Sequence, residues 1–302
     1  MCNNETINIL PSQLTVTNTT TVKICKPYKC AKSLSSCTYD YNQCCDTLCM
    51  SQRILVTLST PKSLCEFKID QDNEPTTKII KLDKMNCHHI TSMSQYGKSI
   101  IGISDYGFNI YICDQHNVTT QLFARDNSNL ECSVIELLNK KNIAATNKIN
   151  IVGTYMRGHT LFFIVFQSCG TLRVMHIMSV PICYCGCAPK YDQSKIEIHG
   201  SYDMYKLSLC NNICKKHAKN MTVMNVTTGP HNELYILSSY GKGGYIWRIE
   251  YFPNLSSYSI IMKCVTQKIN CSPRTITFVN NKFIVITNPN KCGDFVTMYT
   301  FM

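Results

Sequence analysis

The densest group of chemically reactive side chains lies between residues 183 and 217. Three cysteines alternate over Cys183–Cys187, and Cys210, Cys214 and His217 follow further along the chain. Thiolates and imidazole nitrogens are zinc ligands, but structural zinc sites usually pair cysteines with roughly two to four residues between them. Three alternating cysteines cannot easily reach one ion. We therefore predict disulfides in this stretch, with a zinc site as the alternative, and we predict neither a bound metal nor a cofactor.

The cysteine content as a whole indicates an oxidising compartment. The chain holds 20 cysteines in 302 residues, and so many thiols are unusual in a reducing cytosol. An even number allows complete pairing, but the spacing does not determine which cysteines are joined. The cysteines that we take as disulfide candidates are Cys25, Cys30, Cys37, Cys44, Cys45, Cys49, Cys183, Cys185, Cys187, Cys210, Cys214, Cys264, Cys271 and Cys292.

Recognisable catalytic motifs are absent from the sequence. A sialidase needs clustered arginines for the substrate carboxylate and an activated tyrosine, whereas the arginines here are few and spread from Arg53 to Arg274. The segment 104–107 resembles an Asp-box but lacks its intervening residue and terminal Trp. No nucleophile elbow, phosphate-binding loop, dinucleotide fingerprint or His-Glu-x-x-His motif occurs. We therefore predict that the chain is not an enzyme, and a carbohydrate-active enzyme such as a sialidase is the weaker alternative.

Tyrosine is the side chain best suited to recognition in this chain. Seventeen tyrosines are present, and tyrosine offers a large amphipathic contact area at a low entropic cost. The candidates carried by predicted turns are Tyr96, Tyr106 and Tyr240, together with Lys242 in a glycine-rich loop. We predict that these four residues contribute to a binding surface. The alternative is that the tyrosines only cap the ends of strands.

Asn-x-Ser/Thr sequons are spread over the sequence. Such sequons are glycosylated on exposed loops of secreted proteins, although a chain this rich in Asn, Ser and Thr carries several by chance. The predicted glycosylation sites are Asn4, Asn18, Asn117, Asn220, Asn225, Asn254 and Asn270. Cys271 directly follows Asn270 and is expected to hinder modification there.

A repeated pattern of short strands defines the predicted fold. Four units place a β-like run, a short turn, a more apolar run and then a third strand in succession, and a fifth unit starts later in the pattern. The first two runs of the four units are 90–94 and 99–104, 149–155 and 160–165, 221–226 and 233–238, and 274–278 and 282–287. A meander of this kind cannot bury both faces alone, but sheets packed around an axis can. We predict an all-β, disulfide-rich β-propeller of five or six four-stranded blades, with a two-sheet sandwich as the alternative.

The chain divides into two regions on composition. Residues 1–50 form a cysteine-rich N-terminal segment, from which residues 18–25 are expected to add one strand to the main domain. Residues 51–302 form the propeller-like domain, with an insertion at about 181–220 that has room for a degenerate blade at 195–199 and 204–209. Residues 133–141 are the one stretch with a helical pattern.

Charge and hydropathy indicate where the protein is located and what kind of partner it binds. The first residues show no secretory leader, and no apolar run approaches the roughly 20 residues of a membrane span. We therefore expect a processed or spliced chain in the secretory pathway or outside the cell, without a membrane span of its own. The net charge of +11 suits an acidic receptor or sulfated polysaccharide. No nucleic-acid-binding motif is present.

The disulfide-rich, sequon-bearing pattern of meander blades resembles the receptor-binding heads of viral attachment glycoproteins, such as the paramyxoviral type. The bias toward Lys, Asn and Ile and the missing leader also make the chain similar to a spliced herpesviral envelope subunit of the roseolovirus glycoprotein Q kind. This resemblance implies a virion-surface glycoprotein that binds a host cell-surface receptor or companion envelope glycoproteins during attachment to and penetration of host cells. A secreted immune-modulating binding protein is the alternative.

Overall fold

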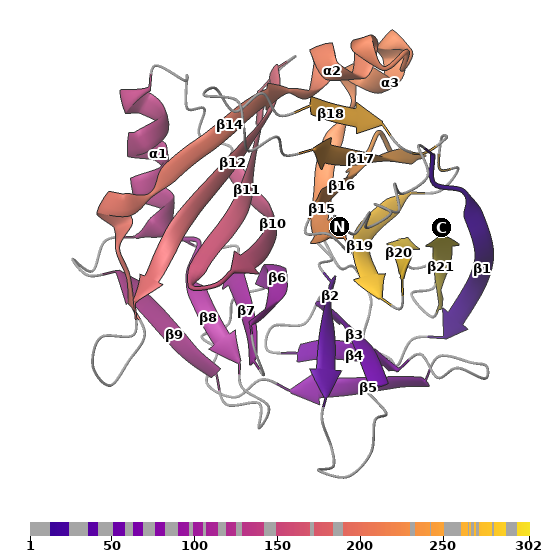
Figure 1. The fold of residues 1–302 in the computed structure, drawn as a ribbon, viewed down its shortest axis with the longest axis horizontal. Coiled ribbons are helices and arrows are strands. Elements are labelled where there is room, and N and C mark those ends of the chain that lie inside the picture. The colour runs from indigo at the N-terminus through magenta and orange to yellow at the C-terminus, as the bar shows by residue number, and fades with distance from the viewer. Residues whose placement is uncertain are drawn as a thin grey trace, which may run out of the picture.

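The structure is a computed structural model, and it describes part of the chain. The described residues are 13–23, 36–41, 51–57, 63–68, 76–81, 90–96, 99–104, 107–113, 119–124, 129–141, 149–169, 172–183, 190–229, 233–241, 243–250, 261–264, 266, 269, 272–279, 281–287 and 295–302. Most of these residues lie in β-strands, which confirms the all-β class (Figure 1).

The strands form antiparallel groups of four, each named here after its first strand. The β2 group contains β2 (Ser36–Tyr41), β3 (Ser51–Thr57), β4 (Ser63–Lys68) and β5 (Thr76–Lys81). The β6 group contains β6 (Ile90–Tyr96), β7 (Ser99–Ser104), β8 (Ile110–Cys113) and β9 (Thr119–Ala124). The β10 group contains β10 (Ile149–Arg157), β11 (Thr160–Cys169), β12 (Leu172–Cys183) and β14 (Glu197–Asp203).

Two further groups complete the arrangement. The β15 group contains β15 (Thr222–Thr228), β16 (Leu234–Ser239), β17 (Gly244–Glu250) and β18 (Ile261–Cys264). The β19 group contains β19 (Pro273–Val279), β20 (Lys282–Thr287), β21 (Phe295–Phe301) and, as its outer strand, β1 (Val16–Lys23). The short strand β13 (Lys190–Tyr191) pairs in parallel with β9 and joins two neighbouring groups into one sheet.

The first strands of the groups pack against one another in a closed ring. β2 contacts β6, β6 contacts β10, β10 contacts β15, β15 contacts β19, and β19 contacts β2. Figure 1 shows the sheets radiating from this centre. The fold is therefore propeller-like, with the first strand of each group as its inner strand.

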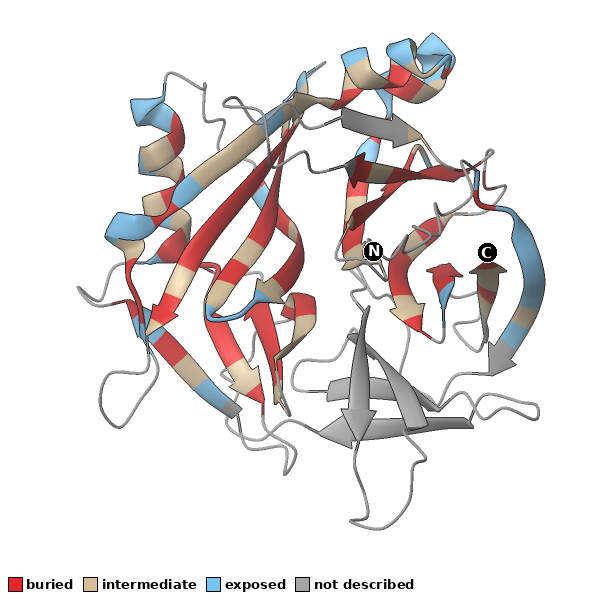
Figure 2. Ribbon diagram, in the orientation of Figure 1, coloured by how far each residue is buried: buried red, intermediate tan, exposed pale blue. Residues whose placement is uncertain are grey.

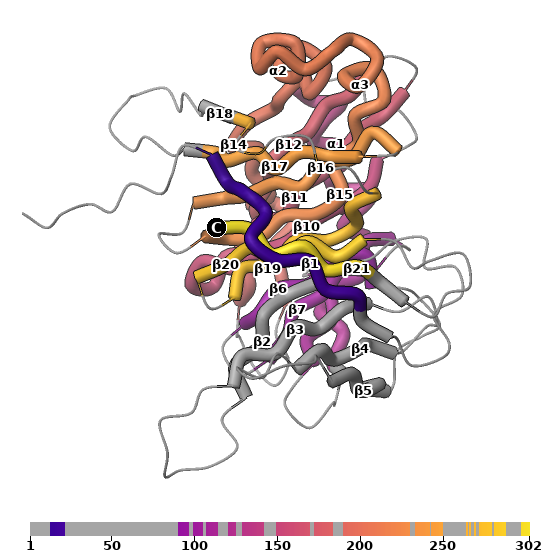
Figure 3. Tube along the Cα trace, turned by 90° about the vertical axis from the view of Figure 1, so that its right-hand side faces the viewer, coloured from indigo at the N-terminus to yellow at the C-terminus, as the bar shows by residue number. Residues whose placement is uncertain are grey.

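The N-terminal strand closes the sheet that the C-terminus forms. β1 pairs with β21 from Val16 opposite Phe301 to Lys23 opposite Phe295, and the two strands run side by side in Figure 3. Thr15 and Met302 exchange backbone hydrogen bonds of 3.0 and 3.1 Å. The strand expected near residues 18–25 is confirmed. The described strands within residues 1–50, β1 and β2, both belong to the propeller-like ring.

The core lies between neighbouring groups. One apolar cluster fills the space between the β6 and β10 groups, a second lies between the β10 and β15 groups, and a third lies between the β15 and β19 groups. The second strands β7, β11, β16 and β20 are buried along most of their length, as the red ribbons in Figure 2 illustrate. Strands covered on both faces read as continuous apolar runs, which is why the sequence located them.

Helices occupy the connections. Helix α1 (Leu130–Lys140) confirms the predicted helical stretch, and Asn129 caps it by accepting a 2.8 Å hydrogen bond from the Glu131 N–H. The predicted insertion contains the 3-10 turn η1 (Gln193–Lys195), helix α2 (Met204–Cys210) and helix α3 (Lys215–Lys219). Among the described residues, no helix is long and apolar enough to cross a membrane.

The degenerate blade predicted at 195–199 and 204–209 is wrong. Residues 197–203 instead form β14, which pairs with β12 as the outer strand of the β10 group. Residues 204–209 are helical because Asp203 caps α2, accepting hydrogen bonds from Tyr205 N at 3.0 Å and Lys206 N at 3.1 Å. A helix N-cap satisfies backbone donors that a strand would leave open here.

Candidate functional site

Four inner strands carry a β-bulge near their first residues. The pairing register shifts between Ile90 and Ser92 in β6, between Ile151 and Gly153 in β10, between Val223 and Asn225 in β15, and between Pro273 and Thr275 in β19. A bulge inserts one extra residue and redirects its side chain. The extra residues are Thr91, Val152, Met224 and Arg274.

All four bulge residues line one cavity, which we call the axial cavity. Its volume is about 450 Å³, within the range of roughly 300–1,000 Å³ typical of ligand sites. The inner strands line the cavity with residues near their N-terminal ends. β11 and β16 line it with residues near their C-terminal ends, and the β16–β17 turn contributes Gly241. The remaining lining residues are Asn150, Ile151, Phe166, Ser168, Thr222, Val223, Ser239, Gly241 and Ser272.

The lining chemistry of the axial cavity favours an anion. Among its described lining residues, Arg274 is the one charged side chain, and the other polar groups are hydroxyls and the Asn150 amide. Burial lowers the pKa of Arg274, because removing a guanidinium from water disfavours its charged form. An acidic group bound in the cavity would offset that cost with charge-assisted hydrogen bonds.

The residue after each bulge is buried at the axis. These residues are Ser92, Gly153, Asn225 and Thr275. Asn225 is 1% exposed, and its amide Oδ1 accepts hydrogen bonds from Thr275 Oγ1 at 3.1 Å and Ile276 N at 3.3 Å. Its Nδ2 donates to the carbonyl of Val152 at 3.4 Å. One side chain in β15 therefore ties both neighbouring inner strands together below the cavity.

The β16–β17 turn forms part of the cavity wall and is supported from behind by α3. The ring of Tyr240 stacks on His217 with centroids 3.8 Å apart and an interplanar angle of 14°. His217 Nδ1 also shares a 3.3 Å hydrogen bond with Tyr245 Oη. Ser239 Oγ accepts from Gly241 N at 3.3 Å, so the turn that presents Gly241 to the cavity is fixed at both ends.

Of the four residues predicted to share one binding surface, the two that the structure describes lie far apart. Tyr240 lies beside the axial cavity, whereas Tyr96 ends β6 at the opposite end of the inner strands and hydrogen-bonds His159 Nδ1 at 3.1 Å. Tyr106 and Lys242 lie outside the described residues. The bulge residues were not predicted. Each follows an apolar residue and precedes a small or amide one, but the bulge itself is a shift in the pairing between two strands and only the paired structure shows it.

One predicted glycosylation site is wrong. Asn225 is buried and makes three hydrogen bonds, so it has no room for a glycan in the folded chain. Asn18 and Asn220 are exposed, and their modification stays a prediction. The other four sequons, at Asn4, Asn117, Asn254 and Asn270, lie outside the described residues.

The predicted disulfides remain predictions. Cys183, Cys210, Cys214 and Cys264 have described side chains, and all four are free thiols in the structure. The side chains of the other candidates lie outside the described part of the chain. Within that described part, no group of three His, Cys, Asp or Glu side chains is placed to hold a metal ion.

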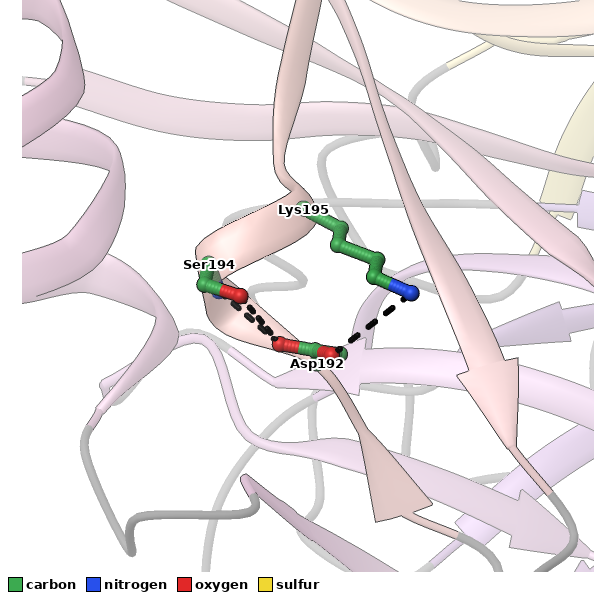
Figure 4. Close-up of polar contacts among 3 residues, drawn as sticks. All are labelled: Asp192, Ser194 and Lys195. Carbon is green, nitrogen blue, oxygen red and sulfur yellow. Dashed lines mark hydrogen bonds and ion pairs between the residues drawn. The ribbon is translucent and has the colours of Figure 1, made fainter.

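A separate polar cluster around Asp192 has a structural role. Asp192 Oδ1 accepts hydrogen bonds from Ser194 N at 3.2 Å and Ser194 Oγ at 2.6 Å, and its Oδ2 lies 4.0 Å from Lys195 Nζ (Figure 4). The carboxylate thereby caps η1, where the chain turns from β13 to β14. None of the three residues lines the axial cavity.

No protein-family model matches the chain, and no curated protein sequence matches it. Among solved structures, it is similar to streptogramin B lyase, at 9% identity over 94% of this chain and 98% of that one, with a TM-score of 0.42. A putative glucose dehydrogenase from Thermus thermophilus shows 6% identity over 94% and 100% of the two chains, with a TM-score of 0.42. The β-propeller domain of Vanderwaltozyma polyspora Nup133 shows 11% identity over 82% and 68%, with a TM-score of 0.39.

These similarities correct the prediction that the chain is not an enzyme. Streptogramin B lyase, the glucose dehydrogenase, a putative gluconolactonase and a luciferin-regenerating enzyme are all among the similar structures. With TM-scores of 0.35 to 0.42, the similarities assign no reaction to this chain.

Proposed function

We propose that the chain is an extracellular recognition protein, built as a propeller of five blades, which binds an acidic group of a cell-surface partner in its axial cavity. The observation that carries the proposal is the convergence of four bulges on one cavity with a guanidinium in its wall. The five blades are the β2, β6, β10, β15 and β19 groups, and β1 closes the last of them.

The charge of the chain supports an acidic partner. The net charge is +11, which accelerates the approach of an acidic surface and makes association sensitive to salt. At short range, Arg274 would supply paired N–H donors, and Thr91, Thr222 and Ser272 hydroxyls line the same cavity. A carboxylate takes such donors well. The partner we favour is a host cell-surface protein or a companion envelope glycoprotein that presents an Asp or Glu side chain.

The extracellular setting rests on the cysteines and the sequons. Twenty cysteines are compatible with folding in an oxidising compartment. Asn18 and Asn220 are exposed, so a glycan on either would extend into solvent. The attachment role that the sequence suggested fits a rigid scaffold that holds one binding end toward the partner.

The test measures binding of the fluorescently labelled full chain to a panel of cells. We expect Arg274→Ala to weaken binding about 10- to 100-fold, since a hydrogen bond to a charged group contributes about 1.5–3 kcal/mol. Arg157→Ala is the matched control. Arg157 is exposed at the β10–β11 turn, so its replacement removes the same charge at a place away from the cavity. Unfolding followed by tryptophan fluorescence shows whether each variant is folded.

Treating the cells identifies the partner class. Surface proteolysis should abolish binding, and heparan-degrading lyase should leave it intact. Equal binding by Arg274→Ala and the unmodified chain would remove the axial cavity from the proposal. Loss of binding after lyase treatment would show that the partner is sulfated polysaccharide and would contradict a protein partner.

A further inference from the structure

A second group of reactive side chains lies behind the cavity wall, where α2 and α3 meet β17 and β18. Figure 1 shows the two helices next to β18. This group, called the helix–strand cluster here, contains Cys214, His217, Tyr240, Tyr245 and Cys264. None of the five lines the axial cavity.

Hydrogen bonds made by residues on either side of Cys214 fix its position in the chain. Asn211, three residues before it, accepts a 3.0 Å hydrogen bond at its Oδ1 from the backbone N–H of Cys264. His217, three residues after it, shares the 3.3 Å hydrogen bond with Tyr245 Oη. Tyr245 lies in β17 and Cys264 in β18, so both ends of this short segment are fixed to the same pair of strands.

Cys264 faces the same side of the sheet as Tyr245. It is directly opposite Trp247 in the β17–β18 pairing, and Tyr245 lies two residues before Trp247, on the same face of the strand. Cys264 packs against the apolar cluster that contains Tyr245, Trp247 and Ile213. Ile213 directly precedes Cys214, so the helical segment is seated on the face of the sheet that Cys264 occupies.

The two thiols share a neighbour and differ in exposure. Both act on the Tyr245 phenol, whose pKa is raised to about 12 by burial first and then by Tyr240, Cys264 and Cys214. Cys214 is exposed, and Cys264 is partly buried. Cys214 is the N-cap residue of α3 but makes no side-chain capping hydrogen bond, so no cap is lost if its sulfur reacts.

We propose that Cys214 and Cys264 are joined by a disulfide when the chain meets an oxidising thiol–disulfide buffer. The exposed Cys214 thiolate attacks a small disulfide such as oxidised glutathione, forming a mixed disulfide and releasing one glutathione thiol. The Cys264 thiolate then attacks the Cys214 sulfur and displaces the second glutathione thiol. One glutathione disulfide is thereby reduced to two thiols, and the two protein thiols become one disulfide.

The bond would fix the outer strand of the β15 group to the helical insertion. It would also hold α3, whose His217 stacks on Tyr240, against the turn that forms the cavity wall. The pairing itself does not depend on what the axial cavity binds.

The experiment uses the full chain refolded in a glutathione redox buffer. Remaining thiols are alkylated, and the protein is digested without reduction and analysed by mass spectrometry. The expected result is a peptide pair that joins Cys214 to Cys264 and separates on reduction. Alkylation of both thiols in the oxidised chain, or a bond from Cys264 to Cys210 or to any other cysteine, would overturn the proposal.

Variants provide an independent readout. Cys214→Ser, Cys264→Ser and the double variant should each lower the thermal midpoint of the oxidised chain by about 5 °C. The double variant should lose no more than either single one, because all three lack the same bond. Cys132→Ser is the matched control, since Cys132 is an exposed cysteine in α1 that is not among the disulfide candidates, and it should retain the full midpoint. Additive losses from the two single variants would contradict a shared bond.

Discussion

Replacing Asn225 by aspartate tests whether the axial hydrogen bonds hold the inner strands together. The change keeps the size of the side chain and its Oδ1 acceptor, which binds Thr275 Oγ1 and Ile276 N. It replaces the Nδ2 donor, which binds the Val152 carbonyl, by a second oxygen. At neutral pH the variant therefore buries a negative charge and opposes an oxygen to a carbonyl that has lost its donor.

The structure sets the size and the pH dependence of the effect. A buried carbonyl without its partner costs about 1–3 kcal/mol, and an uncompensated buried charge brings the total loss to about 3–5 kcal/mol. Burial raises the pKa of the new carboxyl above its unfolded value of about 3.9. The folded variant then takes up a proton before the unfolded chain does, and the neutral acid can donate to Val152 O. The deficit relative to the unmodified chain should shrink by about 1.4 kcal/mol per pH unit below the folded pKa.

Urea unfolding at pH 7.5 and pH 5 measures both quantities. Trp247 is the one tryptophan of the chain, and it is fully buried in β17 with its Nε1 donating to Ser238 Oγ at 2.8 Å. Its fluorescence therefore reports on unfolding of the β15 group, to which Asn225 belongs. Asn150→Asp, at an exposed position of the same inner ring, is the control and should change stability little at either pH. A loss equal at both pH values, or no loss at all, would refute the role assigned to Asn225.

Three further changes test other parts of the fold. Burial lowers the pKa of His176 from 6.5 to about 4, so the unfolded chain binds a proton that the folded chain does not. Stability should therefore fall by about 3 kcal/mol as the pH drops from 6.5 to 4. His176→Gln should flatten this dependence in urea unfolding, and an unchanged dependence would show that His176 is not its cause. An added Cβ at Gly153 would lie 2.0 Å from Val226 Cγ1, so Gly153→Ala should cost about 1–3 kcal/mol in the same assay. Adding Val226→Ala should recover part of that loss, and no recovery would show that the contact is not the cause. Asp203→Ala should lower the free energy of unfolding by about 1 kcal/mol through the lost cap of α2, and a loss of equal size from Asp203→Asn would contradict a capping role.

The sequence located strands where apolar runs mark them and missed those without such runs. The second strands over 99–104, 234–239 and 282–287 are buried nearly throughout, so their apolar character is continuous and legible. β2 (Ser36–Tyr41) lies in a cysteine-rich, polar stretch and has no such run. Its place in the ring depends on pairing with β3 and packing between β19 and β6, and neither is encoded locally.

The candidate site was beyond sequence reasoning for a related reason. A bulge is a property of the hydrogen-bond register between two strands, so nothing in β19 alone marks Arg274 as the extra residue. Asn225 shows the same limit, because its Asn-Val-Thr triplet reads as an exposed sequon until the neighbouring inner strands are in place around it. The cavity was missed because it is assembled from strands that are far apart along the chain.

In the four inner strands with a bulge, the bulge residue and the residue after it have different roles. The residue after the bulge packs at the axis and is Ser, Gly, Asn or Thr. Each is small or, like Asn225, held by several hydrogen bonds, because the strands approach too closely there for a larger side chain, as Gly153 against Val226 demonstrates. The bulge residue itself is Thr, Val, Met or Arg, a range of size and charge that the closed ring tolerates because these side chains point into the cavity. Since the bulge turns the two side chains in different directions, the lining of the cavity can differ from strand to strand without opening the ring. A site built in this way can change its ligand through the bulge residues alone, which is why Arg274, rather than the buried residues beneath it, is the position whose replacement should alter binding while leaving the fold intact.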